Sequence, residues 1–232
     1  MEPLILDGHS LQLQNIWEVA YQERSVAILP EAYFKLANAR HVVEAYLQSE
    51  QVIYGVNTGF GYLKNQKINP QQIAQLQKNL IYSHATGVGT AFSIPEVRAI
   101  LLLRLNTLLQ GYSGVRPEII DLLVEFLNRG IHPVIPSQGS VGASGDLTPL
   151  AHLALCLIGE GQVWDRQKKF PTRILLKEKQ LAPITLEAKE GLALINGTQP
   201  MCALAALVTL RMDRLLDIAD MATALTVQAT LG

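Results

Sequence analysis

A short glycine-rich stretch, residues 139–146, contains three residues that could become an electrophile without any added cofactor. They are Ala143, Ser144 and Gly145. Because glycine has no side chain, the amide nitrogen of Gly145 can closely approach the carbonyl carbon of Ala143. Attack by that nitrogen closes a five-membered ring. Loss of water from the ring and from the Ser144 hydroxyl then leaves an exocyclic methylene, an electrophile that no ordinary side chain provides.

Other uses of a glycine-rich loop fit these residues less well. A phosphate-binding loop ends in Gly-Lys-Ser or Gly-Lys-Thr, whereas here Asp146 follows Gly145 and its carboxylate would repel a phosphate. A hydrolase nucleophile turn needs glycine two residues before and after the serine, and Asp146 breaks the second condition. The five histidines lack the spacing of a zinc site, so we expect no metal. For an isolated Ala-Ser-Gly, a plain flexible turn is the simplest alternative.

The context of the loop favours the electrophile. Residues 132–152, HPVIPSQGSVGASGDLTPLAH, closely resemble the signature of the histidine ammonia-lyase family. Two further segments resemble that family in the same order, YGVNTGFG at 54–61 and LINGTQ at 194–199. The resemblance implies that Ala143, Ser144 and Gly145 form a methylidene-imidazolone group, with no external cofactor, which serves to eliminate ammonia from an amino acid. Prolines on both sides of the loop would hold it compressed for that cyclisation.

By the same resemblance, Tyr54 matches the family's catalytic tyrosine, which removes a proton from the β-carbon of the substrate. A free tyrosine has a pKa near ~10, so this role needs positive charge or hydrogen-bond donors nearby. Asn196 matches an asparagine near the prosthetic ring and the substrate amine, and its amide can both donate and accept. The structural alternatives are a packed tyrosine at a strand end and a helix-capping asparagine.

His84 occupies the family's substrate-selecting position. Relatives that act on phenylalanine or tyrosine tend to carry Phe-Leu or His-Leu where this chain has Ser83 and His84, so the pair favours histidine as the substrate. The alternative is a histidine at a helix C-terminus, where the helix dipole favours its charge. The resemblance thus implies conversion of L-histidine to trans-urocanate and ammonia by a homotetramer. A tyrosine or phenylalanine ammonia-lyase, an aminomutase and a non-catalytic truncated subunit are the other candidates.

Two departures from the family pattern bear on activity. Thr148 stands where many members have alanine or valine. The family's C-terminal site residues, including an arginine that grips the substrate carboxylate, have no counterpart before Gly232. We therefore expect this chain to be the N-terminal half of such an enzyme and to be inactive alone.

Composition limits the class of protein. Of 232 residues, 49% are apolar and 17% are charged, which is typical of a globular chain. The net charge of −1 and the absence of a basic run argue against nucleic acid as a partner. No apolar run looks long and pure enough to span a membrane, and no signal peptide is evident. We expect a cytoplasmic protein with a small-molecule substrate, in which Cys156 and Cys202 are buried free thiols.

The pattern along the chain predicts a mainly α fold with a small β element. We expect residues 1–197 to form an N-terminal domain that carries the motif loop, and 198–232 to begin a truncated central helical region. An extended segment is expected at 52–62 and a hairpin between 163 and 170. The expected helices span residues 31–49, 70–82, 94–111, 117–130, 147–159 (capped by Asp146), 173–180, 185–191 and 198–232.

Overall fold

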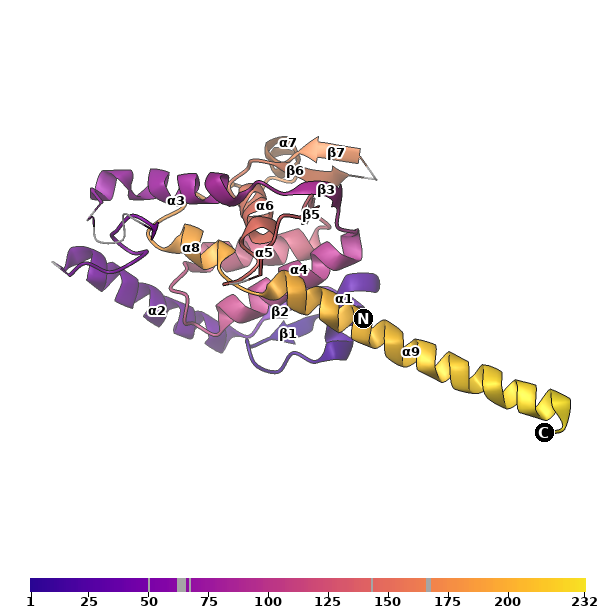
Figure 1. Cartoon of the computed structure of the whole chain (residues 1–232). Helices are drawn as coiled ribbons and strands as arrows, with labels where there is room; N and C mark the ends of the chain where they lie inside the picture. Colours follow the sequence, from indigo (N-terminus) through magenta and orange to yellow (C-terminus); the bar gives the residue numbers. More distant parts are fainter. Residues whose placement is uncertain (50, 62–65, 67, 143, 166–167) are drawn as a thin grey trace.

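A buried helix, α4 (Ile94–Leu109), forms the centre of the fold. It begins where predicted, at a capping box in which a Glu96 carboxylate oxygen accepts a hydrogen bond from the Ser93 backbone N–H at 2.7 Å. Packed against it are α1 (Leu13–Tyr21), α5 (Pro117–Asn128) and the first turns of α9 (Gln199–Thr230) (Figure 1). The computed structural model describes residues 1–49, 51–61, 66, 68–142, 144–165 and 168–232.

A second group of helices packs beside this centre. Helix α3 (Pro70–His84) begins as predicted, with the Asn69 side chain accepting from the backbone N–H of Gln71 at 3.1 Å. It packs against α6 (Leu147–Leu157) and α8 (Glu190–Ile195), which also contact each other. The remaining helices are α2 (Pro30–Gln48) and α7 (Thr172–Glu178). The mainly α prediction is therefore confirmed.

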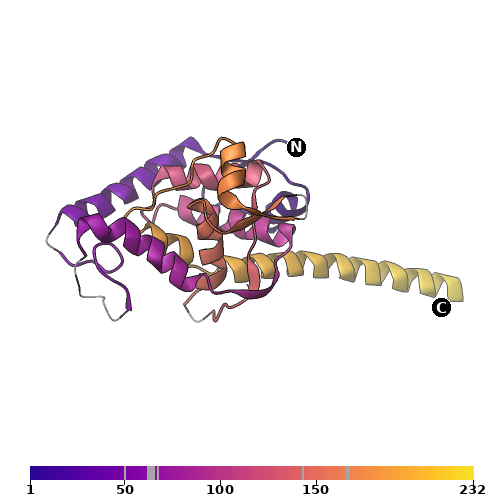
Figure 2. The same ribbon diagram turned by 90° about the horizontal axis from the view of Figure 1, so that it is seen from above.

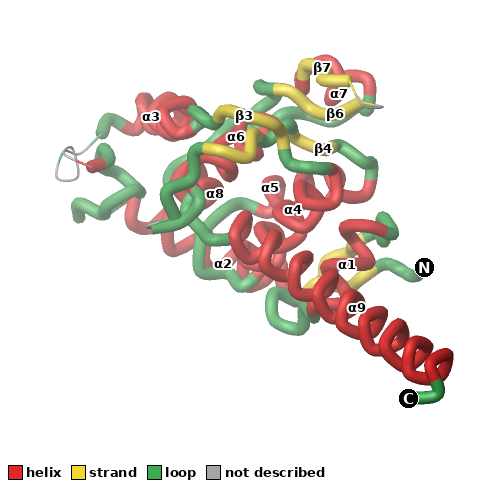
Figure 3. The backbone as a smooth tube through the Cα atoms, turned by 45° about the vertical axis from the view of Figure 1, so that its right-hand side comes forward, coloured by secondary structure: helices red, strands yellow, loops and turns green. Residues whose placement is uncertain are grey.

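Within the described residues, the strands are short and form three small sheets (Figure 3). Strand β1 (Leu4–Leu6) pairs in parallel with β2 (Val26–Ile28), and β3 (Val88–Ala91) pairs antiparallel with β5 (Pro136–Gln138). The third sheet has the order β4-β6-β7 and consists of β4 (His132–Pro133), β6 (Gln162–Asp165) and β7 (Lys168–Pro171). The predicted hairpin is the β6-β7 pair.

Helix α9 is buried only near its beginning, although Arg211 donates to the Tyr21 hydroxyl and Arg214 lies 3.7 Å from the centre of the Trp17 ring, both on α1. Its buried residues all lie in the first turns, at Gln199, Pro200, Ala203, Ala206 and Leu207. From residue 211 onward every residue is exposed, and the helix runs away from the body of the molecule in both ribbon views (Figures 1 and 2). The exposed part carries apolar side chains, including Met212, Leu215, Leu216, Ile218, Met221 and Leu225.

By length and composition alone, the stretch from Glu190 to Thr230 could cross a membrane, with a mean hydropathy of 1.4 in its most apolar window. Length and composition are weak evidence for a span, because the core helix of a protein passes the same test. Half of that window is buried inside the protein, and charged residues follow at Arg211, Asp213, Arg214, Asp217 and Asp220. Burial and charge together favour a helix rooted in a protein core over a membrane span.

Two local predictions are wrong. Within the expected extended segment, residues 54–57 form a turn, in which the N–H groups of Val56 and Asn57 donate to the Ile53 carbonyl, and residue 62 lies outside the described part. The helix expected at 185–191 begins only at Glu190. Its carboxylate accepts from the backbone N–H of Glu187 at 2.7 Å, and the turn this closes includes Lys189 with φ +68°.

The two cysteines differ from each other. Cys156 is buried, and burial raises the pKa of its thiol to about 12, so it stays protonated and unreactive. Cys202 is exposed on the first turns of α9, so the expectation of two buried thiols is wrong for this residue. Helix α9 offers only one narrow buried stripe near its start, and Cys202 lies outside it.

Candidate active site

One cavity of about 590 Å³ brings together residues that are far apart in the sequence. Tyr54, His84, Ser144 and Asn196 all line it. They come from the turn after α2, the end of α3, the motif loop and the residue that follows α8. The rest of the wall is largely apolar, with Phe60, Leu76, Leu80, Leu147, Leu192 and Ile195. Of the remaining predicted residues, Gly145 is buried directly behind Ser144, and Ala143 lies outside the described residues.

The turn that carries Tyr54 is held by buried polar side chains. Asn57 is 3% exposed; its Oδ1 accepts from the Ile53 N–H at 2.8 Å and its Nδ2 donates to the Gln51 carbonyl at 2.7 Å. Gly55 has φ +74°, and a Cβ there would lie 2.6 Å from Leu192 Cδ2. The backbone is therefore fixed, while the Tyr54 ring itself stays 53% exposed and can meet a ligand.

His84 is the last residue of α3, and its ring is oriented by the helix end. Nδ1 lies 2.9 Å from the Leu80 carbonyl oxygen and 3.0 Å from Ser83 Oγ. A carbonyl oxygen can only accept, so Nδ1 carries the proton in that contact and a neutral ring has Nε2 as an acceptor. His84 can therefore end the helix and serve the site at once, because Nδ1 binds the Leu80 carbonyl and Nε2 remains for a ligand.

The motif loop is built on glycines in conformations that other residues rarely adopt. Gly139, Gly142 and Gly145 have φ of +134°, +70° and +133°. A Cβ on Gly145 would lie 2.9 Å from the carbonyl oxygen of Gly197 and 3.0 Å from its nitrogen. Two glycine backbones therefore pack face to face, and sterics require glycine at the position whose amide is predicted to close the ring. This close packing fits the requirements of a methylidene-imidazolone.

Asp146 stands at the N-cap position of α6, as predicted, but its side chain makes no capping hydrogen bond there. Its Oδ1 accepts from Ser140 Oγ at 2.6 Å, and its Oδ2 accepts from the Met201 N–H in the first turn of α9 at 2.9 Å. Its own N–H donates to the Gly197 carbonyl at 2.7 Å. The buried carboxylate thus lies at a different helix N-terminus, where the dipole also favours negative charge. It ties the start of the motif loop to α9.

Asn196 ends α8, which is held firmly from two sides. The Gln77 side chain of α3 is 1% exposed, and its Oε1 accepts from the N–H groups of Gly191 and Leu192 at 2.9 and 3.4 Å. Glu190 is fully buried and accepts from Arg116 Nε at 2.8 Å. The Gln77 contacts therefore join α3 and α8, which form two walls of the cavity.

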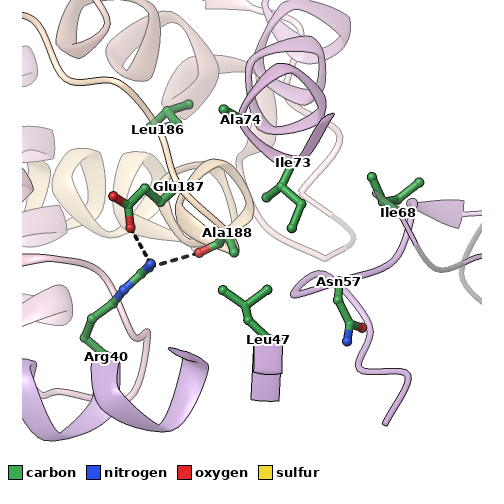
Figure 4. Close-up of a pocket in the computed structure, with 9 residues that line it drawn as sticks. All are labelled: Arg40, Leu47, Asn57, Ile68, Ile73, Ala74, Leu186, Glu187 and Ala188. Carbon is green, nitrogen blue, oxygen red and sulfur yellow. Dashed lines mark hydrogen bonds and ion pairs between the residues drawn. The ribbon is translucent and has the colours of Figure 1, made fainter. Parts of the chain in front are cut away.

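A second cavity, of about 280 Å³, is lined by Asn57 of the Tyr54 turn and by residues of α2, α3 and the segment before α8 (Figure 4). Arg40, from α2, donates to the Ala188 carbonyl at 3.1 Å and to the Glu187 carboxylate at 2.5 Å. These contacts, drawn as dashed lines in Figure 4, fix the segment that leads into α8. Asn57 lines the same cavity, so the residue that supports the Tyr54 turn and the residues that fix the segment before α8 face one space.

Sequence patterns did not single out the supporting residues Gln77 and Glu190, nor Arg104 of α4, which donates to the Asn196 carbonyl at 3.2 Å. A charged or amide residue within an apolar helical run is the available signal, and Arg104 in α4 shows it most clearly. The partner of such a residue is set by tertiary packing, so the pattern alone indicates that a contact is needed and not which one.

Comparison with known proteins gives concordant results. Residues 11–232 match the family model described as aromatic amino acid lyase. The histidine ammonia-lyase of Gloeobacter violaceus is 52% identical over 99% of this chain and 45% of its own length. The crystal structure of histidine ammonia-lyase from Trypanosoma cruzi superposes with a TM-score of 0.91 at 39% identity, over 98% of this chain and 44% of that one. Tyrosine aminomutase from Streptomyces globisporus gives 0.84 at 41% identity, over 89% and 39%. The chain thus spans about 45% of the length of the curated relatives it matches.

Proposed function

This chain belongs to the aromatic amino acid lyase family, and we propose that the whole protein is a histidine ammonia-lyase that converts L-histidine to trans-urocanate and ammonia. The observation that carries the proposal is the cavity in which Tyr54, His84, Ser144 and Asn196 meet. Tyr54, Ser144 and Asn196 come from three separate motifs and His84 from a fourth segment, and a shared site accounts for their meeting at one wall.

The prosthetic group would be made from Ala143, Ser144 and Gly145. When present, it supplies an electrophilic carbon that turns the substrate amino group into a good leaving group. The face-to-face packing of Gly145 on Gly197 and the opening of Ser144 onto the cavity support this assignment. Asn196 would hold the amine, because its amide can donate and accept in one place.

Tyr54 would take the proton from the substrate β-carbon. Its exposed ring lies in the same cavity as Ser144, and the buried Asn57 keeps its backbone from moving away. A positioned general base of this kind contributes about 10²–10⁴-fold to rate. The apolar wall formed by Phe60 and Leu192 would exclude water from the transfer.

His84 supports histidine as the substrate. With Nδ1 bound to the Leu80 carbonyl, Nε2 is the acceptor that a substrate imidazole N–H requires. Tyrosine aminomutase is a relative of comparable identity, so a tyrosine or phenylalanine enzyme, with ammonia released or returned to the β-carbon, is the alternative.

We also propose a cytoplasmic homotetramer that acts in histidine breakdown. The apolar residues along the exposed part of α9 support burial by other subunits, since such a surface is unusual on a monomer. In this proposal residues 1–197 form the domain that carries the motif loop, and residues 198–232 begin the central helical region. This chain alone is expected to bind substrate poorly and to be inactive.

The test uses the full-length protein with L-histidine, L-tyrosine and L-phenylalanine, with products separated and ammonia measured. We expect ammonia and urocanate from histidine at a kcat/KM far above those for the other two. Preferred turnover of tyrosine, or formation of a β-amino acid without ammonia, would contradict the substrate or the reaction respectively. A protein mass that retains both waters at residues 143–145 would indicate a non-catalytic subunit.

A further inference from the structure

Arg104 is a buried cation with unusual surroundings. It lies within α4, is 2% exposed, and forms no ion pair with a carboxylate among the described residues. Its Nη1 donates to the Asn196 carbonyl at 3.2 Å and to Gln199 Oε1 at 2.8 Å, while its buried Nε has no hydrogen-bond partner within the described chain. Burial lowers its pKa to about 10, so the guanidinium is still charged near neutral pH. A buried charge without a counter-ion is costly, so its retention calls for a reason beyond packing.

The contacts of Arg104 hold one particular piece of backbone. Gln199 is fixed a second time, because its Nε2 donates to Thr107 Oγ1 at 3.1 Å, also on α4. A Cβ on Gly197 would lie 2.1 Å from Gln199 Oε1 and 2.5 Å from Arg104 Nη1. Residues 196–199 are therefore packed directly on these two side chains, and we call this arrangement the α4 platform.

The opposite face of the platform is the motif loop. Gly145 packs on Gly197 so closely that no Cβ fits between them, and the Asp146 N–H donates to the Gly197 carbonyl at 2.7 Å. Gly197 is thus sandwiched between the guanidinium of Arg104 and the backbone of Gly145. A displacement of the platform would move the residue whose nitrogen must close the ring.

We infer that Arg104 is a positioning residue for ring formation, which with Gln199 presses residues 196 and 197 against Gly145 and holds its nitrogen in the attacking geometry. This inference rests on the proposed function. A trans peptide chain normally keeps the reacting nitrogen and carbonyl carbon apart, so the loop must be held compressed from outside. The platform supplies that support from the core side of the loop.

The reaction it would promote is balanced without an oxidant or reductant. The Gly145 nitrogen forms a bond to the Ala143 carbonyl carbon. The carbonyl oxygen leaves as water with the protons of the Gly145 and Ser144 amides, and a C=N double bond forms to the Ser144 nitrogen. Ser144 then loses its hydroxyl and its Cα proton as a second water, which leaves the methylene. Two waters of mass are the signature of completion.

The chain offers a matched control in the same helix. Arg98 is also 2% exposed, and it donates to the backbone carbonyls of Val19 and Leu127 at 2.7 and 2.9 Å. The acceptors belong to α1 and α5, and a third partner, His132 Nε2, lies 3.2 Å from Nη1. Arg98→Met and Arg104→Met remove the same atoms from the same helix, and only the second releases the platform.

The experiment measures intact mass and thermal unfolding of full-length wild type, Arg98→Met and Arg104→Met. We expect wild type and Arg98→Met to lack two waters, and the ring-bearing fraction in Arg104→Met to fall about tenfold or more. An Arg104→Met protein that lacks both waters would overturn this inference and leave the proposed function standing. The same would follow if both variants lost the ring in proportion to their loss of thermal stability. A wild type of undiminished mass would overturn the proposed function, and this inference with it.

A second pair of variants covers the case in which Arg104→Met does not fold. Gln199→Met removes the side-chain acceptor and donor of the platform, and Gln199→Glu replaces them with a carboxylate that pairs with Arg104 in the same place. We expect the two-water deficit to be lost in the first and kept in the second. The same deficit in both, or its loss in a folded Gln199→Glu protein, would overturn the positioning role.

Discussion

The two ends of α4 bury the same residue type to the same extent and use it differently. At one end, Arg98 donates to backbone carbonyls of α1 and α5 and lies beside His132, all within the structural core. At the other end, Arg104 donates to the backbone and side chain of the segment that supports the motif loop. Burial alone does not distinguish a structural arginine from one that serves a site; the identity of the acceptors does.

The two ends also differ in how fully the guanidinium is satisfied. Arg98 binds through Nε and Nη1, whereas the Nε of Arg104 has no partner within the described residues. An unsatisfied buried donor lowers stability. The unpaired Nε of Arg104 therefore lowers the stability of the folded protein, whereas the Nε of Arg98 is paired. Such a cost is expected near a functional site.

The largest difference between the two ends of α4 is expected when one methyl group is added near Arg104. Gly145→Ala would place a Cβ 2.9 Å from the Gly197 carbonyl oxygen at a φ of +133°. Backbone bounds the space, so nothing can rotate aside. We expect the two-water deficit to disappear and turnover to fall about 10³-fold or more, measured by mass and by urocanate formation. Turnover within a few-fold of wild type would show that the packing is loose.

Asn196→Ala separates the backbone role of the platform from the side-chain role in the cavity. The variant keeps the carbonyl that Arg104 binds and removes the amide that lines the cavity. We expect normal ring formation and a kcat lower by about 10²-fold, as for loss of one aligned hydrogen-bonding group. Ring loss in a folded Asn196→Ala protein would instead assign the side chain to loop support.

At the Arg98 end the expected effect concerns stability and pH. Burial, and then the charge of Arg98, lowers the pKa of His132 to about 4 from its usual 6.5. Below pH 6.5 the unfolded chain binds a proton that the folded chain refuses, so stability present above that pH is lost as pH falls toward 4. We expect about 2 kcal/mol to be lost by pH 5.

His132→Gln is the variant that checks this. The amide does not titrate and its oxygen can still accept from Arg98. Urea unfolding of both proteins at pH 7.5 and pH 5 should show the wild type losing the extra stability, while ring formation is unchanged in both. Parallel losses in wild type and variant would assign the acid sensitivity to other groups.

The smallest effect is expected from Gly130→Ala, the Arg98-end counterpart of Gly145→Ala. Gly130 also has positive φ, at +64°, but its Cβ would meet only His132 Cε1, at 3.7 Å. An alanine held at positive φ lowers the free energy of unfolding by about 1 kcal/mol. This lowers the melting temperature by about 2–4 °C. Activity should be unchanged. A loss of activity here would mean that the two ends are coupled through α4.

Local signals predicted the helices well. Asn69, Ser93 with Glu96, and Pro117 each mark a helix start that the structure has within a residue, because capping depends on neighbours in sequence. The motifs also named four residues that line one cavity, although their roles stay predictions.

What could not be predicted depends on contacts across the chain. The parallel β1-β2 pair encloses α1, and the acceptor of Arg104 lies 92 residues away at Asn196. Asp146 was expected to cap the helix that follows it, whereas its carboxylate reaches Met201. For both residues, the sequence indicates that a partner is needed, and only the packed fold decides which one.

The contact between Asp146 and the first turn of α9 has a mechanical consequence. The exposed part of α9 extends about 35 Å beyond its buried root, at 1.5 Å per residue. Beyond the buried turns, Arg211 and Arg214 also contact α1, so the helix is held over about four turns from Gln199 before it leaves the body of the protein. The Asp146 contact lies at the inner end of this held stretch. Bending of the exposed arm therefore takes place away from the motif loop.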